Sequence, residues 1–239
     1  MTSTRKTSVI VGLLFLTQTV AFIIAEQLIN GVVTGPDFVT GAATHSSSLV
    51  AGGLLAAVSG VAVVTISVVL FPLFKGTSEP MALAYVCERV VELVVQIFFF
   101  LIVPLMLIQI SQDLRAGTLE ASLSPSLSSP LKGLLDVAVV VLYLVTSVGG
   151  VILGVLLYRS RLVPRWLALL ALVGYLMLFV GCVLDLFGAT DVTQGVGLLA
   201  IAPGGVFELV LPIWLLAKGF SATCAPVADD AALQLVSVG

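Results

Sequence analysis

Apolar residues dominate six stretches of the chain, and polar residues gather in the segments between them. Each stretch is long enough to cross the hydrocarbon core of a bilayer, which takes about 20 residues of helix. A helix satisfies its own backbone groups where no water is available. The pattern therefore predicts an all-α, polytopic membrane bundle of about six transmembrane helices. Their expected ranges are 7–29, 49–74, 81–108, 134–158, 165–187 and 195–217.

The composition supports a membrane protein. The chain has 239 residues, of which 59% are hydrophobic and 10% are charged, whereas a soluble domain carries about 25% charged residues. Little sequence is left over for a soluble region, so we expect residues 1–239 to form a single membrane domain. No basic run indicates nucleic acid, and the expected surroundings are the lipid bilayer.

The first apolar stretch follows Arg5 and Lys6, an arrangement that also begins secretory signals. The run from Thr7 to Ile29 is longer than the apolar core of such a signal, and no small-x-small cleavage site closes it convincingly. We therefore predict a helix that is retained in the protein.

The basic residues predict the orientation of the bundle. Only Arg115 and Lys132 fall on one side of the predicted membrane, and seven basic residues fall on the other side. The basic side of a membrane protein is cytoplasmic. We therefore expect a protein of the cell membrane with both termini in the cytoplasm. The seven residues are Arg5, Lys6, Lys75, Arg159, Arg161, Arg165 and Lys218.

Two of the predicted external connections are long, at 30–48 and 109–133. The second is rich in Ser, Leu and Pro, and we expect a flexible loop there, with a lid or an interfacial segment as alternatives.

Cysteine and histidine give no indication of a metal or cofactor. Cys87, Cys182 and Cys224 show no CxxC spacing, so neither a disulfide framework nor a zinc site is supported. His45 is the only histidine, which excludes a bis-histidine haem or a multi-histidine metal centre within this chain. We expect no cofactor and no metal.

Ionisable residues in the third apolar stretch need a physical reason, because charge in a bilayer core costs a few kcal/mol and normally faces the bundle interior. Glu88, Glu92 and Gln96 recur every four positions and Arg89 precedes Glu92 by three, so all four lie along one broad stripe of a helix. Glu208, in the sixth stretch, is expected at the same depth. We therefore predict an interhelical contact between Arg89 and Glu208.

These polar residues allow two interpretations. Two carboxylates around one guanidinium leave a surplus negative charge unless one is protonated, which makes Glu92 or Glu208 a candidate proton carrier. Arg89, Glu92, Gln96 and Glu208 are accordingly our candidates for a ligand-binding or proton-carrying site. Structural ion pairs also hold helices together, and a buried pair is weak evidence of function.

The segment Pro203-Gly204-Gly205 precedes Glu208 in the same stretch. Proline removes a backbone donor and glycine loosens a helix, so we expect a break or kink here. Broken helices expose their termini at the substrate sites of transporters, although Pro and Gly are also ordinary in membrane helices.

Acidic residues near the outer ends of the stretches form a second group of candidates: Glu26, Asp136 and Asp185. Carboxylates at an interface are ordinarily solvated. The alternative is an acidic external vestibule, shared with Asp37 and other external acids, that would suit cations.

Small residues predict close contacts between helices. Ala56 and Gly60 are four positions apart, as are Gly150 and Gly154, and Gly149 adjoins them. Small residues at this spacing let helix backbones approach in lipid, and we interpret them as packing contacts within the bundle.

Four segments spread over nearly the whole chain carry a family resemblance. They are Ala25-Glu26 late in the first stretch, Glu88-Arg-Val-Val-Glu92 opening the third, Tyr158-Arg-Ser-Arg-Leu-Val-Pro-Arg-Trp-Leu-Ala168 entering the fifth, and Pro203-Gly-Gly-Val-Phe-Glu208 with Trp214-Leu-Leu-Ala-Lys-Gly219 in the sixth. With these motifs the chain resembles the bacterial membrane family named domain of unknown function 4386. The resemblance implies a bacterial membrane protein of six helices, and it implies no activity.

Three functions remain open. A binding or transport module would hold a small polar molecule at the Arg/Glu cluster and would contain a water-accessible cavity. A membrane enzyme acting on a lipid or isoprenoid would use Glu92 or Glu208 as acid and base, and would open sideways between helices. A structural or partner-binding subunit would use the ion pair as a brace and would contain no pocket.

Overall fold

The computed structural model describes residues 3–35 and 37–221, within which every regular element is a helix and no strand occurs. This confirms the all-α class. The helices are α1 (Ser3–Val33), α2 (Phe38–Gly41), α3 (Ser46–Ile97), α4 (Val103–Ala116), α5 (Ser124–Ser160), α6 (Arg165–Leu186) and α7 (Leu198–Ala217). A π-helical turn, Phe98–Ile102, joins α3 to α4, and 3-10 turns precede α5 and α7 at Ala121–Leu123 and Gly195–Gly197.

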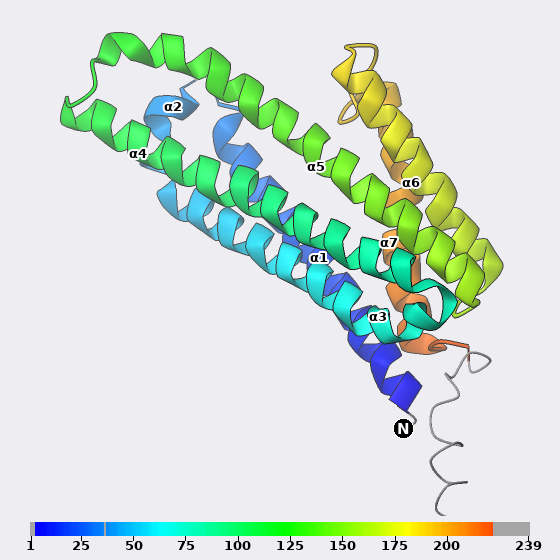
Figure 1. Ribbon diagram of the computed structural model, residues 1–239. Coiled ribbons are helices and arrows are strands. Elements are labelled where there is room, and N and C mark those ends of the chain that lie inside the picture. Colours follow the sequence, from blue (N-terminus) through cyan, green and yellow to red (C-terminus); the bar gives the residue numbers. More distant parts are fainter. Residues whose placement is uncertain (1–2, 36, 222–239) are drawn as a thin grey trace, which may run out of the picture.

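Helix α3 reverses direction within what is otherwise continuous helix. Five helical segments are long and apolar enough to cross a membrane, and one of them, Ser46–Ala116, has 71 residues. Ser78 interrupts it with extended dihedral angles (φ −165°, ψ 103°), and the chain doubles back at that point (Figure 1). The extended angles suit a serine N-cap, and Pro80 then falls in the first turn of the second limb, where its missing N–H costs nothing.

The two limbs of this hairpin, 46–77 and 79–97 with α4, pack against each other. A Cβ built on Gly53 would lie 2.9 Å from the Phe100 carbonyl oxygen, and one built on Gly60 would lie 2.6 Å from a Leu93 methyl carbon. The segment therefore supplies two membrane-length limbs, which brings the number of limbs to the six that the sequence predicts. The predicted four-residue spacing of Ala56 and Gly60 serves this packing, since Ala56 is fully buried.

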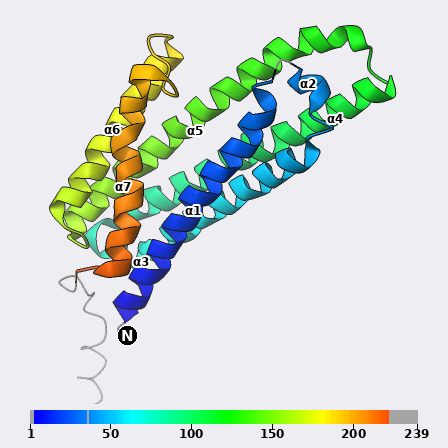
Figure 2. The same ribbon diagram turned by 180° about the vertical axis from the view of Figure 1, so that it is seen from behind.

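The molecule is a V of two unequal arms that share one end, which we call the base (Figures 1 and 2). Helices α1, α3, α4 and α5 form the larger arm, and α6 and α7 form the smaller. The N-terminus, the reversal at Ser78, the connection from α5 to α6 and the end of α7 all lie at the base. The seven basic residues of the predicted cytoplasmic side belong to these base segments.

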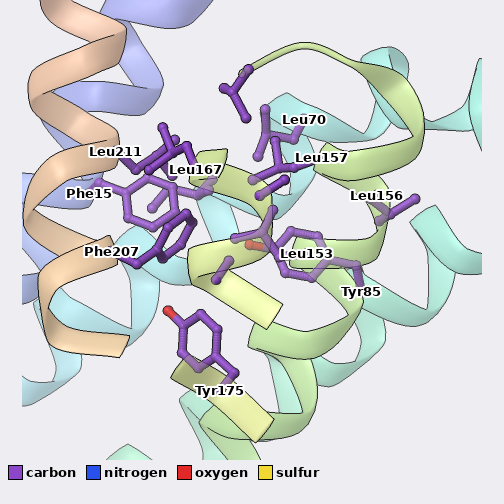
Figure 3. Packing of buried hydrophobic residues seen from close by; sticks show 14 of the residues in the cluster. Phe15, Leu70, Tyr85, Leu153, Leu156, Leu157, Leu167, Tyr175, Phe207 and Leu211 are labelled. Atoms are coloured by element: carbon purple, nitrogen blue, oxygen red, sulfur yellow. The ribbon is translucent and has the colours of Figure 1, made fainter. Parts of the chain in front are cut away.

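A large apolar core fills the base half and continues along the smaller arm to Cys182 and Val192, and every membrane-length helix contributes to it. Figure 3 shows its central side chains from α1, α6 and α7 packed against those of α3 and α5. Labelled members are Phe15, Leu70, Tyr85, Leu153, Leu156, Leu157, Leu167, Tyr175, Phe207 and Leu211. A second core lies in the outer half of the larger arm, and its buried members come from α1 to α5 and the π-helical turn alone within the described residues.

The prediction of a flexible loop over 109–133 is wrong. Helix α4 continues to Ala116 and α5 already begins at Ser124, so the connection is only a few residues long. Pro125 falls in the first turn of α5, where proline is well tolerated, and the Ser-rich composition therefore marks a helix start. The predicted connection at 30–48 is also shorter, because α1 runs to Val33 and the short helix α2 fills part of it.

The predicted break at Pro203 is not found, since α7 is one continuous helix from Leu198 to Ala217. The small residues here serve packing instead. A Cβ built on Gly174 of α6 would lie 2.5 Å from the Gly204 nitrogen and 2.8 Å from the Pro203 carbonyl carbon. The backbones of α6 and α7 are therefore in direct contact at this point.

Gly174→Ala should consequently lower the free energy of unfolding by about 1–3 kcal/mol, because the new methyl group meets backbone that only a shift of α7 can relieve. Gly133→Ala is the matched control, since a Cβ at Gly133 of α5 meets no atom within 4 Å. Denaturant unfolding in detergent measures both. Equal transitions for the two variants would contradict the described α6–α7 contact.

Candidate functional site

A cavity of about 270 Å³ is lined by residues of both arms of the V. All four predicted candidates, Arg89, Glu92, Gln96 and Glu208, contribute to its wall, and so does Glu26. The wall combines residues of α1, both limbs of α3, α5, α6 and α7. The remaining lining residues are Gln18, Thr19, Phe22, Ile23, Ser59, Val63, Leu142, Tyr143, Thr146, Tyr175, Leu178, Ile201, Gly204, Gly205 and Leu209.

The guanidinium of Arg89 is buried and is paired with carboxylates of its own helix. Its Nη1 contacts Glu92 Oε2, and its Nε lies 3.1 Å from Glu88 Oε2. The guanidinium carbon also lies 5.1 Å from the centre of the Tyr85 ring. Positions i−1, i+3 and i−4 of one helix are all within reach of a side chain as long as arginine, so the charge is satisfied without a partner from another helix.

Glu92 links this ion pair to α5. Its Oε1 accepts a hydrogen bond of 3.0 Å from the Thr146 hydroxyl and a longer one of 3.4 Å from Gln96 Nε2. The amide oxygen of Gln96 is buried and has no hydrogen-bond partner. An unpartnered buried polar atom is uncommon in native proteins and asks for an explanation.

The predicted contact between Arg89 and Glu208 is wrong. Glu208 Oε1 instead accepts a hydrogen bond of 2.9 Å from the Tyr175 hydroxyl of α6, and the ion pairs of Arg89 are those with Glu88 and Glu92. Both residues nevertheless line one cavity. Depth along a helix says nothing of the lateral separation between helices, which the intervening cavity sets here.

Two adjacent glycines of α5 make room for these polar groups. A Cβ on Gly149 would overlap Glu88 Oε2 and Arg89 Nη2, and a Cβ on Gly150 would overlap the Tyr175 ring. A Cβ on Gly154 would likewise lie 2.9 Å from the Cγ of Leu172. The predicted packing role of these glycines is therefore confirmed, and two of them pack against the polar site itself.

The cavity opens sideways between α1 and α7. Ile23 of α1 and Leu209 of α7 line it, and both are about half exposed on the outer surface of the bundle (52% and 51%). Nearer the base the same two helices are in contact, where a Cβ on Gly12 would lie 3.2 Å from the Pro212 carbonyl oxygen and Arg5 donates to the carbonyls of Leu215 and Leu216 at 3.1 and 2.6 Å. Figure 2 shows α1 and α7 close together at the base and diverging above it.

Toward the base the cavity is closed. A space of about 10 Å³, about the size of one water molecule, lies beside Arg89 and is lined by Phe15, Ile66, Tyr85 and Leu153. These four residues belong to the apolar core of the base. The polar wall therefore faces the mouth between α1 and α7, and the packed core separates it from the base.

The outer acidic residues have separate surroundings. Asp136 is exposed and pairs with Lys132 on the same helix. Asp185 accepts a hydrogen bond of 2.6 Å from the Val192 backbone in the turn between α6 and α7. Glu26 lines the cavity. Within the described residues no three acidic, cysteine or histidine side chains gather as metal ligands, so the three carboxylates do not form one cluster.

The turn after α6 carries a further carboxylate, Asp191, outside the helices. Its Oδ1 accepts hydrogen bonds from the Thr193 hydroxyl and backbone nitrogen at 2.6 and 2.8 Å. These hydrogen bonds lower the pKa of Asp191. This acid is thus engaged in local turn structure. His45 directly precedes α3 at the outer end. Cys87 and Cys182 are free thiols, and Cys224 lies outside the described residues.

Sequence reasoning missed the aromatic part of the wall, formed by Phe22, Tyr143 and Tyr175. Tyr143 and Tyr175 lie in the middle of predicted spans, where a hydroxyl needs a partner as a carboxylate does. This signal was available. Thr146, which joins Glu92 to α5, has no such signal because threonine commonly bonds to its own helix.

The model of a family described as a domain of unknown function, DUF4386, matches residues 10–219. The match includes all of the site residues and nearly all of the helical bundle. The chain belongs to the DUF4386 family. No curated protein and no solved structure matches it. Because the DUF4386 description assigns no activity, the function must be argued from the cavity.

Replacing Arg89 with Met should destabilise the protein strongly, by about 3–5 kcal/mol, because removal of one side of a buried ion pair leaves charge without compensation. Adding Glu88→Gln and Glu92→Gln to Arg89→Met should restore most of that loss, since no buried charge then remains at this point. Unfolding in detergent, with Lys132→Met as the exposed control, measures the series. A triple variant no more stable than Arg89→Met would show that the ion pair is not the source of the loss.

Proposed function

We propose that this protein binds a small polar molecule inside the membrane, in the cavity lined by Arg89, Glu92, Gln96 and Glu208. The observation that supports it best is that polar residues from two distant parts of the chain line one cavity. Intramembrane ionisable residues are costly and ordinarily mark a substrate or ion pathway. A cavity that opens at one side and is closed toward the base suits a binding step in transport.

The unpartnered amide oxygen of Gln96 supports the same function. It is buried in the wall of the cavity, whereas the carboxyl groups of Glu92 and Glu208 accept hydrogen bonds from within the protein. A bound molecule with a donor group would satisfy it.

The hypothesis of a purely structural brace has less support. It expects an ion pair that braces the bundle and no pocket, whereas the ion pairs of Arg89 stay within its own helix and a cavity lies beside them. The hypothesis of a membrane enzyme acting on lipid gains one observation, the lateral mouth beside Ile23 and Leu209. Glu92 or Glu208 would act as its acid and base, and identification of the bound molecule decides between cargo and substrate.

We further propose that the base faces the cytoplasm, so that both termini lie inside. Glu120→Cys lies between α4 and α5 at the outer end, and Glu79→Cys lies beside the reversal at the base; both positions are exposed. In a chain whose own cysteines are replaced by alanine, a membrane-impermeant maleimide should label Glu120→Cys in intact cells and Glu79→Cys only after permeabilisation. The opposite pattern would reverse the orientation.

Mass spectrometry of small molecules that co-purify with the protein tests the binding function. Gly205 lies in the middle of the stripe of α7 that lines the cavity, and its Cβ would meet no atom within 4 Å. Gly205→Leu should therefore fill the cavity without disturbing the fold, and Glu208→Gln removes one polar group. The expected result is a specific molecule in the wild type that is lost from both variants.

The control for Gly205→Leu is Gly133→Leu, which adds the same side chain in open space outside the cavity. It should keep the molecule. Circular dichroism and gel filtration confirm that each variant is folded. A wild type without any specific molecule, or equal amounts in all variants, would overturn the proposed function.

A further inference from the structure

Charge in the wall of the cavity is unevenly compensated. The wall holds the carboxyl groups of Glu26, Glu92 and Glu208, and Arg89 is its one basic group among the described residues. The guanidinium is already paired with Glu92 and Glu88. Glu26 and Glu208 make no ion pair within residues 3–35 and 37–221. The free side of the cavity is therefore acidic, and an anion would meet two carboxyl groups with no basic partner to offset them.

Aromatic rings lie beside these carboxyl groups. Phe22 of α1, Tyr143 of α5 and Tyr175 of α6 all line the cavity. The Tyr175 hydroxyl donates to Glu208, and the ring itself packs against Gly150 and Phe207, so Phe22 and Tyr143 are the rings of the wall that remain for a ligand. The faces of aromatic rings attract organic cations, and quaternary ammonium ions are recognised by groups of such rings.

The rest of the wall is mainly apolar and reaches the outer surface between α1 and α7. Val63, Leu142, Leu178 and Ile201 line the interior, and Ile23 and Leu209 border the mouth. A ligand that enters here leaves lipid, so an apolar body favours its arrival as well as its fit. Both carboxyl groups without a basic partner come from the two helices that border this mouth, α1 and α7.

We propose that the ligand is a small organic cation, an alkylammonium ion with an apolar body, held between Glu26 and Glu208 and against the rings of Phe22 and Tyr143. This inference rests on the proposed binding function and names its ligand class. Glu26 and Glu208 provide opposite charge, the rings contact the alkyl groups around the nitrogen, and the apolar wall holds the body. Arg89 stays paired and orients Glu92.

Phenyltrimethylammonium is a suitable probe, and benzenesulfonate is its anionic counterpart. Equilibrium dialysis of each against the full-length protein in detergent, with empty micelles as the blank, measures binding. The expected result is saturable binding of about one cation per chain and no binding of the anion above the blank. Anion binding equal to or stronger than cation binding would overturn the inference.

The variants locate the site. Glu26→Gln and Glu208→Gln should each weaken cation binding by about ten- to a hundredfold, the effect of losing a contact to a charged group. Asp136→Asn removes an exposed, paired carboxylate of α5 and should leave Kd unchanged. Tyr143→Leu should weaken binding and Tyr143→Phe should retain it, because the ring face is kept. Glutamine variants that are folded and bind as the wild type does would contradict the role of both carboxylates.

The failure of this inference is distinguishable from that of the proposed function. If the co-purifying molecule depends on the cavity but is neutral or anionic, and phenyltrimethylammonium does not bind, the function stands and the cation assignment falls. If folded Gly205→Leu binds phenyltrimethylammonium as strongly as the wild type, the cation does not bind in the cavity and this inference is wrong. Whether the co-purifying molecule is retained by Gly205→Leu then decides the proposed function separately.

Discussion

Burial of one guanidinium in the middle of a membrane bundle is the constraint that organises this structure. A lone arginine at this depth is costly, and Glu88 and Glu92 of the same helix offset that cost. The resulting polar group is wide, and α5 approaches it only because Gly149 has no side chain. The next residue, Gly150, accepts the ring of Tyr175 and so fixes the position of α6. The ion pair of α3 therefore contacts α5 at Gly149, and α5 contacts α6 of the smaller arm at Gly150.

Because the arginine is satisfied within its own helix, the acidic groups of other helices are left free to act on something else. An interhelical pair between Arg89 and Glu208 would have closed the space between the arms. The hydrogen bond from Tyr175 holds Glu208 at the cavity wall instead. The location of one ion pair thus decides whether the centre of the bundle is filled by side chains or remains a cavity.

The sequence predicts the number of crossings well, and the four polar residues that it singles out line one cavity, because both depend on strong local signals. The role of these residues stays a prediction. Membrane helices need long apolar runs, and a charge within such a run needs a reason, as Arg89 and Glu92 do. Other predictions were wrong, among them one of a contact between helices and one of local structure. The Arg89–Glu208 contact was wrong because depth does not fix lateral separation, and the loop at 109–133 was wrong because serine and proline start helices as readily as they form loops. Orientation and domain organisation stay predictions.

The reversal at Ser78 has a consequence for how the protein can be engineered. A single extended residue joins two membrane-length limbs there. The glycines of the first limb pack closely against the second limb, so sequence added at Ser78 would disturb that packing. The connection from α4 to α5 is different: it follows Gly117, which has the left-handed conformation (φ 74°) and open space around it. Exposed tips of this kind tolerate insertion. An epitope tag or a fused crystallisation domain accordingly belongs between α4 and α5, at the far end from the base.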